Sequence, residues 1–283
     1  MRDKIKRAGL GPVSHLPGPR NILSKFPSDD YVSLFWGTLS MFGVLIINPE
    51  VALAACSPSA SNNVNTICSG TDQTTQFGTG TEADILATVG SGATVAITKS
   101  SGDALSFYTA SVTVYNYGTV MASNTGPGAA LGLVSATGAT TVTNFGTIAT
   151  TSGSSSAQSV YAKTNAMVTN SGVVTASTTS TGNAFGINAN TGTAQVENSG
   201  SIAANATGSG TATNIWANID VNVTNSGTLS ANTAGTGLAF SIYTNAGSAT
   251  LINSGVISAS SASGNAAVVS PNSKLDCPLI PFK

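Results

Sequence analysis

The sequence predicts an all-β protein, a parallel β-helix (β-solenoid) of about six rungs with 26 to 28 residues in each. Six similar segments recur at steps of 28, 26, 28, 27 and 28 residues, a spread narrow enough to indicate stacked repeats. Inside each segment, apolar and small polar residues alternate with the period of two that a half-buried strand shows. The hydrophobic fraction of 41% argues against disorder, although charged residues make up only 7% of the chain. The chain can therefore bury a core.

Residues 1–54 predict a secretory signal with an extended positively charged region. Six of the ten Lys and Arg residues lie in the first 25 positions, before an uncharged apolar run from Tyr31 to Asn48. The small residues of Ala52-Leu53-Ala54 then provide a cleavage site. The alternative is an uncleaved anchor, because the run of eighteen residues is almost long enough to span a bilayer. We expect export, with membrane contact only through this signal or through a barrel that the sequence lacks.

Residues 55–84 are expected to form an N-terminal cap segment that contains two cysteines. Cys56 and Cys68 are close in sequence and would reach an oxidising compartment, so a local disulfide is the simplest expectation. The alternative is a surface lipoprotein, because the residues from Leu53 to Cys56 also resemble a lipobox whose cysteine is acylated. Cys277 lies in a tail, residues 271–283, that shows no repeat.

Residues 85–270 carry the repeats, which share the pattern V-x-N-S-G-x-[ILV]-x-A. We expect one asparagine from each repeat to lie in a single axial column, where the amides bond from rung to rung. Glycine two positions later would supply the unusual backbone angles of the turn. A structural ladder is favoured over ligand binding for these six residues: Asn116, Asn144, Asn170, Asn198, Asn225 and Asn253.

A second apolar stretch lies about sixteen residues after each asparagine, as in Leu131 to Val134 and Phe240 to Ile242. Each repeat therefore contains two or three short strands, joined by turns of ordinary length. One rung buries too few aliphatic side chains to offset the entropy of ordering its own residues, so no repeat should fold alone.

The sequence offers little for catalysis, and we expect no catalytic residues, no cofactor and no metal site. The only histidine is His15, inside the predicted signal, which removes histidine-dependent hydrolase and metal chemistry from the exported part. The alternative is a β-helical carbohydrate-active enzyme, which would need two of the scattered carboxylates to converge. Only four lysines follow residue 55, so nucleic acid is not an expected partner.

Three aromatic residues are predicted to point outward on adjacent rungs: Tyr115, Tyr117 and Phe145. Later repeats carry Thr, Ser or Glu at the same places. The three rings are a candidate surface contact for a sugar or a protein. The favoured interpretation is that the N-terminal segment folds over them, because terminal solenoid repeats usually need covering.

The repeat pattern, following a signal and an early cysteine pair, resembles the passenger region of autotransporter (type V secretion) proteins. The resemblance covers Ala55 to about Ser270 and implies a right-handed parallel β-helix, exported through the outer membrane and often adhesive. The expected partners are glycans or proteins on host or neighbouring cells, and the lack of catalytic residues predicts that the chain is not an enzyme. The C-terminal β-barrel of such proteins is missing, so we expect a truncated or frameshifted passenger. Its location would be the cell surface or the medium, or the periplasm if the barrel is absent.

Overall fold

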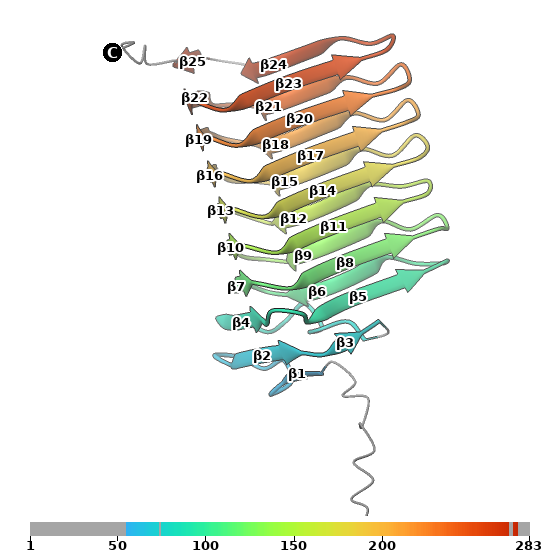
Figure 1. Cartoon of the computed structure of the whole chain (residues 1–283), viewed down its shortest axis with the longest axis vertical. Coiled ribbons are helices and arrows are strands. Elements are labelled where there is room, and N and C mark those ends of the chain that lie inside the picture. The colour runs from blue at the N-terminus through green and yellow to red at the C-terminus, as the bar shows by residue number, and fades with distance from the viewer. Residues whose placement is uncertain (1–54, 74, 272–273, 277–283) are drawn as a thin grey trace, which may run out of the picture. The chain divides into compact units, whose positions relative to one another are not determined.

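The computed structural model describes residues 55–73, 75–271 and 274–276, which belong to one compact unit (Figure 1). These residues form strands and turns and contain no helix. In this part of the chain nothing helical could therefore cross a membrane. The predicted signal at 1–54, with its apolar run and His15, lies outside the described residues, as does Cys277.

The strands form three sheets that the chain visits in turn, so that three consecutive strands make one rung (Figure 1). The first sheet contains β1 (Ala55–Ser57), β2 (Asn65–Ser69), β4 (Ile85–Val89), β7 (Val112–Asn116), β10 (Thr140–Asn144), β13 (Ala166–Asn170), β16 (Ala194–Asn198), β19 (Val221–Asn225), β22 (Ser248–Asn253) and β25 (Lys274–Asp276). The second sheet contains β3 (Thr71–Asp72), β5 (Thr94–Lys99), β8 (Thr119–Asn124), β11 (Thr147–Ser152), β14 (Val173–Thr178), β17 (Ser201–Ala206), β20 (Thr228–Thr233) and β23 (Val256–Ser261). The third sheet contains β6 (Ala104–Thr109), β9 (Ala130–Ser135), β12 (Ala157–Ala162), β15 (Ala184–Ala189), β18 (Ala212–Ala217), β21 (Ala239–Thr244) and β24 (Ala266–Pro271).

Every strand pairs with the equivalent strand of the next rung in parallel, and only β1 and β2 pair in antiparallel fashion. The predicted all-β parallel β-solenoid is confirmed. It has seven rungs, from β4–β5–β6 to β22–β23–β24, one more than the six repeats that an asparagine marks. The first rung lacks that mark because Val89 occupies the place that Asn116 takes in the second rung.

Each sheet contributes columns of apolar side chains to the core. In the second sheet Ile148, Val174 and Ile202 lie in register, and all three are fully buried. Leu133, Val160 and Ile187 do the same in the third sheet. Stacking buries each side chain against its equivalents above and below, which is the contact that one repeat lacks when alone.

The segment 55–84 covers the N-terminal edge of the first rung. Strand β2 pairs with β4, strand β3 pairs with β5, and Phe77 forms a bridge to Phe107 in β6. The Phe77 ring packs on the buried Phe107 ring with centroids 5.2 Å apart. All three sheets are thereby protected at this end, where unpaired backbone groups would otherwise invite pairing with another chain.

Two fully buried side chains among the described residues, Thr109 and Asn214, have polar atoms without a hydrogen-bond partner. Asn214, in the middle of β18, is fully buried, and neither its Oδ1 nor its Nδ2 makes a hydrogen bond. Other rungs carry serine at this place, and the Ser159 and Ser241 hydroxyls donate across the interior to the carbonyl oxygens of Thr175 and Ser258. The amide of Asn214 therefore loses its bonds to water without replacement.

We predict that Asn214→Ser raises the free energy of unfolding by about 1 kcal/mol, because it removes an unsatisfied amide at the cost of a small cavity. The new hydroxyl would reach the carbonyl across the interior as Ser241 does. The matched reverse change, Ser241→Asn, should lower the free energy of unfolding. Chemical denaturation of both variants provides the comparison, and a loss of stability in Asn214→Ser would contradict the prediction.

Candidate ligand-binding face

The six asparagines form one continuous column along the first sheet. The Nδ2 of each donates to the Oδ1 of the asparagine in the next rung, with N to O distances between 2.7 and 2.8 Å at all five steps. Five of the six are buried, and Asn253 in the last rung is exposed. The Nδ2 groups also donate to nearby backbone carbonyls, as Asn198 does to Thr228. These amides are therefore occupied by the fold and are not available to a ligand.

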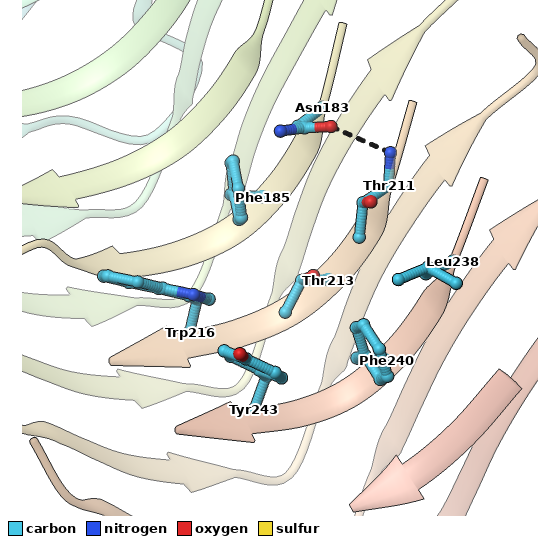
Figure 2. A pocket seen from close by; sticks show the side chains of 8 residues that line it. All are labelled: Asn183, Phe185, Thr211, Thr213, Trp216, Leu238, Phe240 and Tyr243. Atoms are coloured by element: carbon cyan, nitrogen blue, oxygen red, sulfur yellow. Dashed lines mark hydrogen bonds between the residues drawn. The ribbon is translucent and has the colours of Figure 1, made fainter. Parts of the chain in front are cut away.

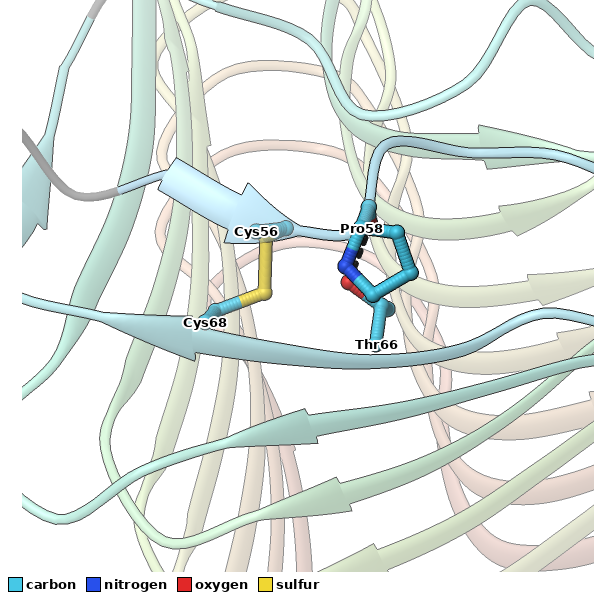
Figure 3. Close-up of a disulfide and its surroundings, with 4 residues drawn as sticks. All are labelled: Cys56, Pro58, Thr66 and Cys68. Atoms are coloured by element: carbon cyan, nitrogen blue, oxygen red, sulfur yellow. Dashed lines mark hydrogen bonds between the residues drawn. A yellow bond between two sulfur atoms is a disulfide. The ribbon is translucent and has the colours of Figure 1, made fainter.

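Cys56 in β1 and Cys68 in β2 form a disulfide (Figure 3), as the sequence predicts. The two residues face each other in the antiparallel pair, and the Thr66 hydroxyl donates to the Pro58 carbonyl at 2.6 Å beside them. The disulfide indicates an oxidising, extracytoplasmic environment. It also engages the sulfur that acylation of Cys56 would need.

Replacing Cys56 and Cys68 together by Ser is expected to destabilise the N-terminal cap by about 2 to 4 kcal/mol, because the cross-link restricts the unfolded chain. Hydrogen exchange at the amides of β2 measures the effect, and Cys277→Ser serves as the control that should change nothing. Alkylation of Cys56 and Cys68 in the oxidised chain would contradict the disulfide.

The cluster of Tyr115, Tyr117 and Phe145 lies on the outside of the second and third rungs. The Tyr117 and Phe145 rings stack with centroids 5.1 Å apart and planes within 7°. The described residues do not cover them, since Tyr115 is 39%, Tyr117 47% and Phe145 52% exposed. The expectation that residues 55–84 fold over these rings is therefore wrong for the described segment. That segment pairs instead with the backbone edge of the first rung.

A larger aromatic surface lies on the outer side of the third sheet. Each of its strands turns its second and fifth residues outward, so two columns of side chains run along the solenoid. The register of the strands aligns the first column as Leu105, Leu131, Gln158, Phe185, Thr213 and Phe240. It aligns the second column as Tyr108, Val134, Tyr161, Asn188, Trp216 and Tyr243. We call these twelve residues the aromatic face.

The upper half of the aromatic face contains a depression of about 350 Å³ over β15, β18 and β21. Figure 2 shows the rings of Phe185, Trp216, Phe240 and Tyr243 arranged around Thr213. Thr213 is only 1% exposed, and its hydroxyl makes no hydrogen bond within the described part of the chain. Rings thus form the walls, and a hydroxyl without a partner lies at the floor.

An amide group borders the same depression. The Oδ1 of Asn183 accepts from the backbone N–H of Thr211 at 2.9 Å, which leaves its Nδ2 for another acceptor (Figure 2). Asn188, which lines neither depression, is 7% exposed and lies in register between Tyr161 and Trp216. Its Nδ2 donates to the Oε1 of Gln158 at 2.8 Å, whereas its Oδ1 has no partner. The face therefore combines apolar rings with unused hydrogen-bonding groups.

The lower half repeats the arrangement three rungs earlier. A depression of about 360 Å³ is lined by Tyr108, Tyr161 and Gln158, with Leu105, Leu131 and Val134 between them. The same two columns supply the lining in both places. Because parallel strands are about 4.8 Å apart, the two depressions lie about 14 Å apart along the solenoid.

The aromatic face carries no ionisable acid or base other than its tyrosines. Asp103, which precedes β6, lines the lower depression, and Lys163 follows β12. Burial raises the pKa of the Tyr161 phenol above its ordinary value of 10.0, although a hydrogen bond with the Asn190 side chain acts in the opposite direction. This phenol is therefore neutral at physiological pH.

Several of the described carboxylates accept hydrogen bonds in turns, whereas Glu197 lies exposed in β16. Glu82 accepts from the backbone and hydroxyl of Thr79, and these bonds lower its pKa below 4.5 although partial burial acts to raise it. Asp103 and Asp220 each accept from a backbone N–H in the next rung, of Ala129 and Ser248, at 2.8 Å. Among the residues that the structure describes, no three His, Cys, Asp or Glu side chains form a cluster that could hold a metal ion.

Searches against models of known protein families, curated proteins and solved structures found no match.

Proposed function

We propose that this chain is an exported binding and structural protein, similar in role to autotransporter passengers, that attaches to glycans or proteins on host or neighbouring cells. The observation that carries the proposal is the aromatic face, where four rings surround the unpartnered hydroxyl of Thr213. The disulfide between Cys56 and Cys68 supports export. The repeat pattern supports the resemblance to passengers, whose place would be the cell surface or the medium.

The proposal assigns no catalysis to the chain. Glycoside hydrolysis needs two carboxylates on either side of the scissile bond, and the lining of the two depressions contains one, Asp103. The neighbouring Asp103 bonds to the backbone of the next rung. The rigid solenoid instead offers a regular surface, over which affinity can be spread among several weak contacts.

Adhesion of beads coated with the purified full chain tests the proposal. We expect such beads to bind cultured epithelial cells or bacterial cells more strongly than beads coated with the same chain after reduction and heat unfolding. Equal binding of the two bead types would contradict it. Release of new reducing ends from a panel of polysaccharides incubated with the chain would contradict the absence of catalysis.

A further inference from the structure

We propose that the aromatic face binds a neutral glycan chain that runs along the solenoid axis and occupies both depressions. This inference rests on the proposed binding function and names its ligand class. It depends on four properties of the face: its rings, its unpartnered polar groups, its lack of charge and its repeat along one direction.

The rings select a ligand with flat apolar faces. Phe185, Trp216, Phe240 and Tyr243 line the upper depression, and each is only partly exposed. Pyranose rings present C–H groups on their faces and hydroxyls at their edges, so they can stack on such rings and still make hydrogen bonds. A lipid surface would use the rings but would leave the polar groups below them without partners.

The polar groups select a ligand rich in hydroxyls. The Thr213 hydroxyl at the floor of the upper depression makes no hydrogen bond in the described part of the chain, and at the margin the Nδ2 of Asn183 is directed away from its Oδ1 bond. Buried polar groups without partners cost stability, and a ligand that satisfies them regains that free energy. Sugar hydroxyls can both donate and accept, so they suit hydroxyl, carbonyl and amide groups alike.

The absence of charge selects a neutral ligand. The twelve residues of the aromatic face include no Lys, Arg, Asp or Glu, and the one charged residue that lines either depression is the acidic Asp103, at the lower one. A sulfated or acidic glycan would be bound without a cation to pair its charge, and single-stranded nucleic acid needs a positive groove beside the stacking rings. A second copy of this chain is not favoured either, because two concave faces placed together leave both sets of depressions unfilled.

The repeat of the face selects a polymer. The same two columns form a depression over the first three rungs and another over the next three, about 14 Å apart at the strand spacing of parallel sheets. One unbranched chain of β-linked sugars can lie along this direction and enter both depressions. Occupying the second depression is then an intramolecular step, which raises the apparent affinity of long ligands over short ones.

Isothermal titration calorimetry of the full chain with cellohexaose and chitohexaose, two neutral hexasaccharides, tests the inference. We expect at least one to bind at least tenfold more tightly than its disaccharide. Trp216→Ala should weaken binding about tenfold or more through lost stacking. Thr213→Val, which keeps the shape and removes the hydroxyl, should weaken it about three- to tenfold.

Tyr117→Ala is the matched control, because it removes an exposed ring outside the aromatic face and should leave binding unchanged. Thermal melts followed by circular dichroism show whether each variant is folded. If Trp216→Ala does not fold, Thr213→Val still tests the inference. The inference is overturned if neither neutral hexasaccharide binds, if only a heparin hexasaccharide binds, or if Tyr117→Ala abolishes binding and Trp216→Ala does not. A dimer of the chain that Trp216→Ala converts to monomer in light scattering would also overturn it. If bead adhesion persists in any of these cases, the proposed function stands and only the ligand assignment fails.

Discussion

Replacing Asn198 by Leu is expected to lower the free energy of unfolding by about 2 to 5 kcal/mol, whereas the same change at Asn253 should cost less than about 1 kcal/mol. Asn198 accepts from Asn170 and donates to Asn225, at 2.8 and 2.7 Å, inside the solenoid. Leucine there leaves the buried Oδ1 of Asn225 without a donor and removes one acceptor of Asn170. Asn253 is exposed and accepts one hydrogen bond from Asn225 in the preceding rung. Its replacement therefore leaves only the Nδ2 of Asn225 without one of its acceptors.

The first rung supports this expectation. Val89 occupies the asparagine position there, and the Oδ1 of Asn116 above it accepts instead from the backbone N–H of Gly118 at 3.2 Å. An apolar residue is thus tolerated at the end of the column, where only one neighbour must find a substitute partner. Denaturation midpoints of Asn198→Leu and Asn253→Leu, with unchanged slopes, measure the difference. Equal losses would mean that the asparagines act as separate turns and not as a ladder.

The sequence predicted the solenoid because its strongest physical constraint repeats in every rung. An asparagine followed by Gly two positions later needs the same turn each time, and the alternating strand before it has one apolar side. That signal located the strands β7, β10 and β13 and their common register. It could not locate the first rung, because Val89 takes the place of the asparagine there. A valine at this position cannot be distinguished in the sequence from any other valine in a strand.

The aromatic face was missed for a different reason. The strands of the third sheet bury their third and fourth residues together, as Ser159 and Val160 show in β12. The ladder between β12 and β15 skips both Ser159 and Gly186, so each strand has one residue outside the regular pleat, and the period of two is interrupted there as it is at a β-bulge. Without that knowledge, Phe185 and Ile187 both appear to belong to the core. The recurrence of Trp216 and Tyr243 at one rung's spacing is the signal that could have separated the outer column.

For the three rings predicted to point outward, the alternation of residues predicts the side of the strand but not whether another segment covers the ring. Period two placed Tyr115 correctly on the outside of β7, because β7 has no bulge. Whether another segment covers such a ring depends on where that segment finds hydrogen-bond partners. The segment 55–84 finds them at the open edges of β4 and β5, and the ring positions contain no information about that competition.

Replacing Gly200 by Ala is expected to lower the free energy of unfolding by about 3 to 5 kcal/mol, because the added methyl group meets backbone and not a movable side chain. A Cβ at this position would lie 2.1 Å from the carbonyl oxygen of Gly172 and 2.7 Å from the carbonyl carbon of Ser171, both in the preceding rung. Relief requires the two rungs to separate. That separation would stretch the bonds from Ser201 N–H to Gly172 and from Gly200 N–H to Asn170, now 2.9 and 3.1 Å.

Gly90→Ala is the matched control, because a Cβ there would meet only the Cys68 carbonyl oxygen, at 3.3 Å. Neither glycine has a left-handed backbone, so the two variants differ in the space for a methyl group and not in φ. The expectation that the glycine after each asparagine supplies unusual backbone angles is therefore wrong, and the close approach of the preceding rung is what requires glycine there. Gly90→Ala should change the free energy of unfolding by less than about 1 kcal/mol. Chemical denaturation compares the two, and hydrogen exchange at the Ser201 amide should rise only in Gly200→Ala. If Gly200→Ala is as stable as Gly90→Ala, the glycine column does not set the spacing of the rungs, and the asparagine ladder beside it must hold that spacing alone.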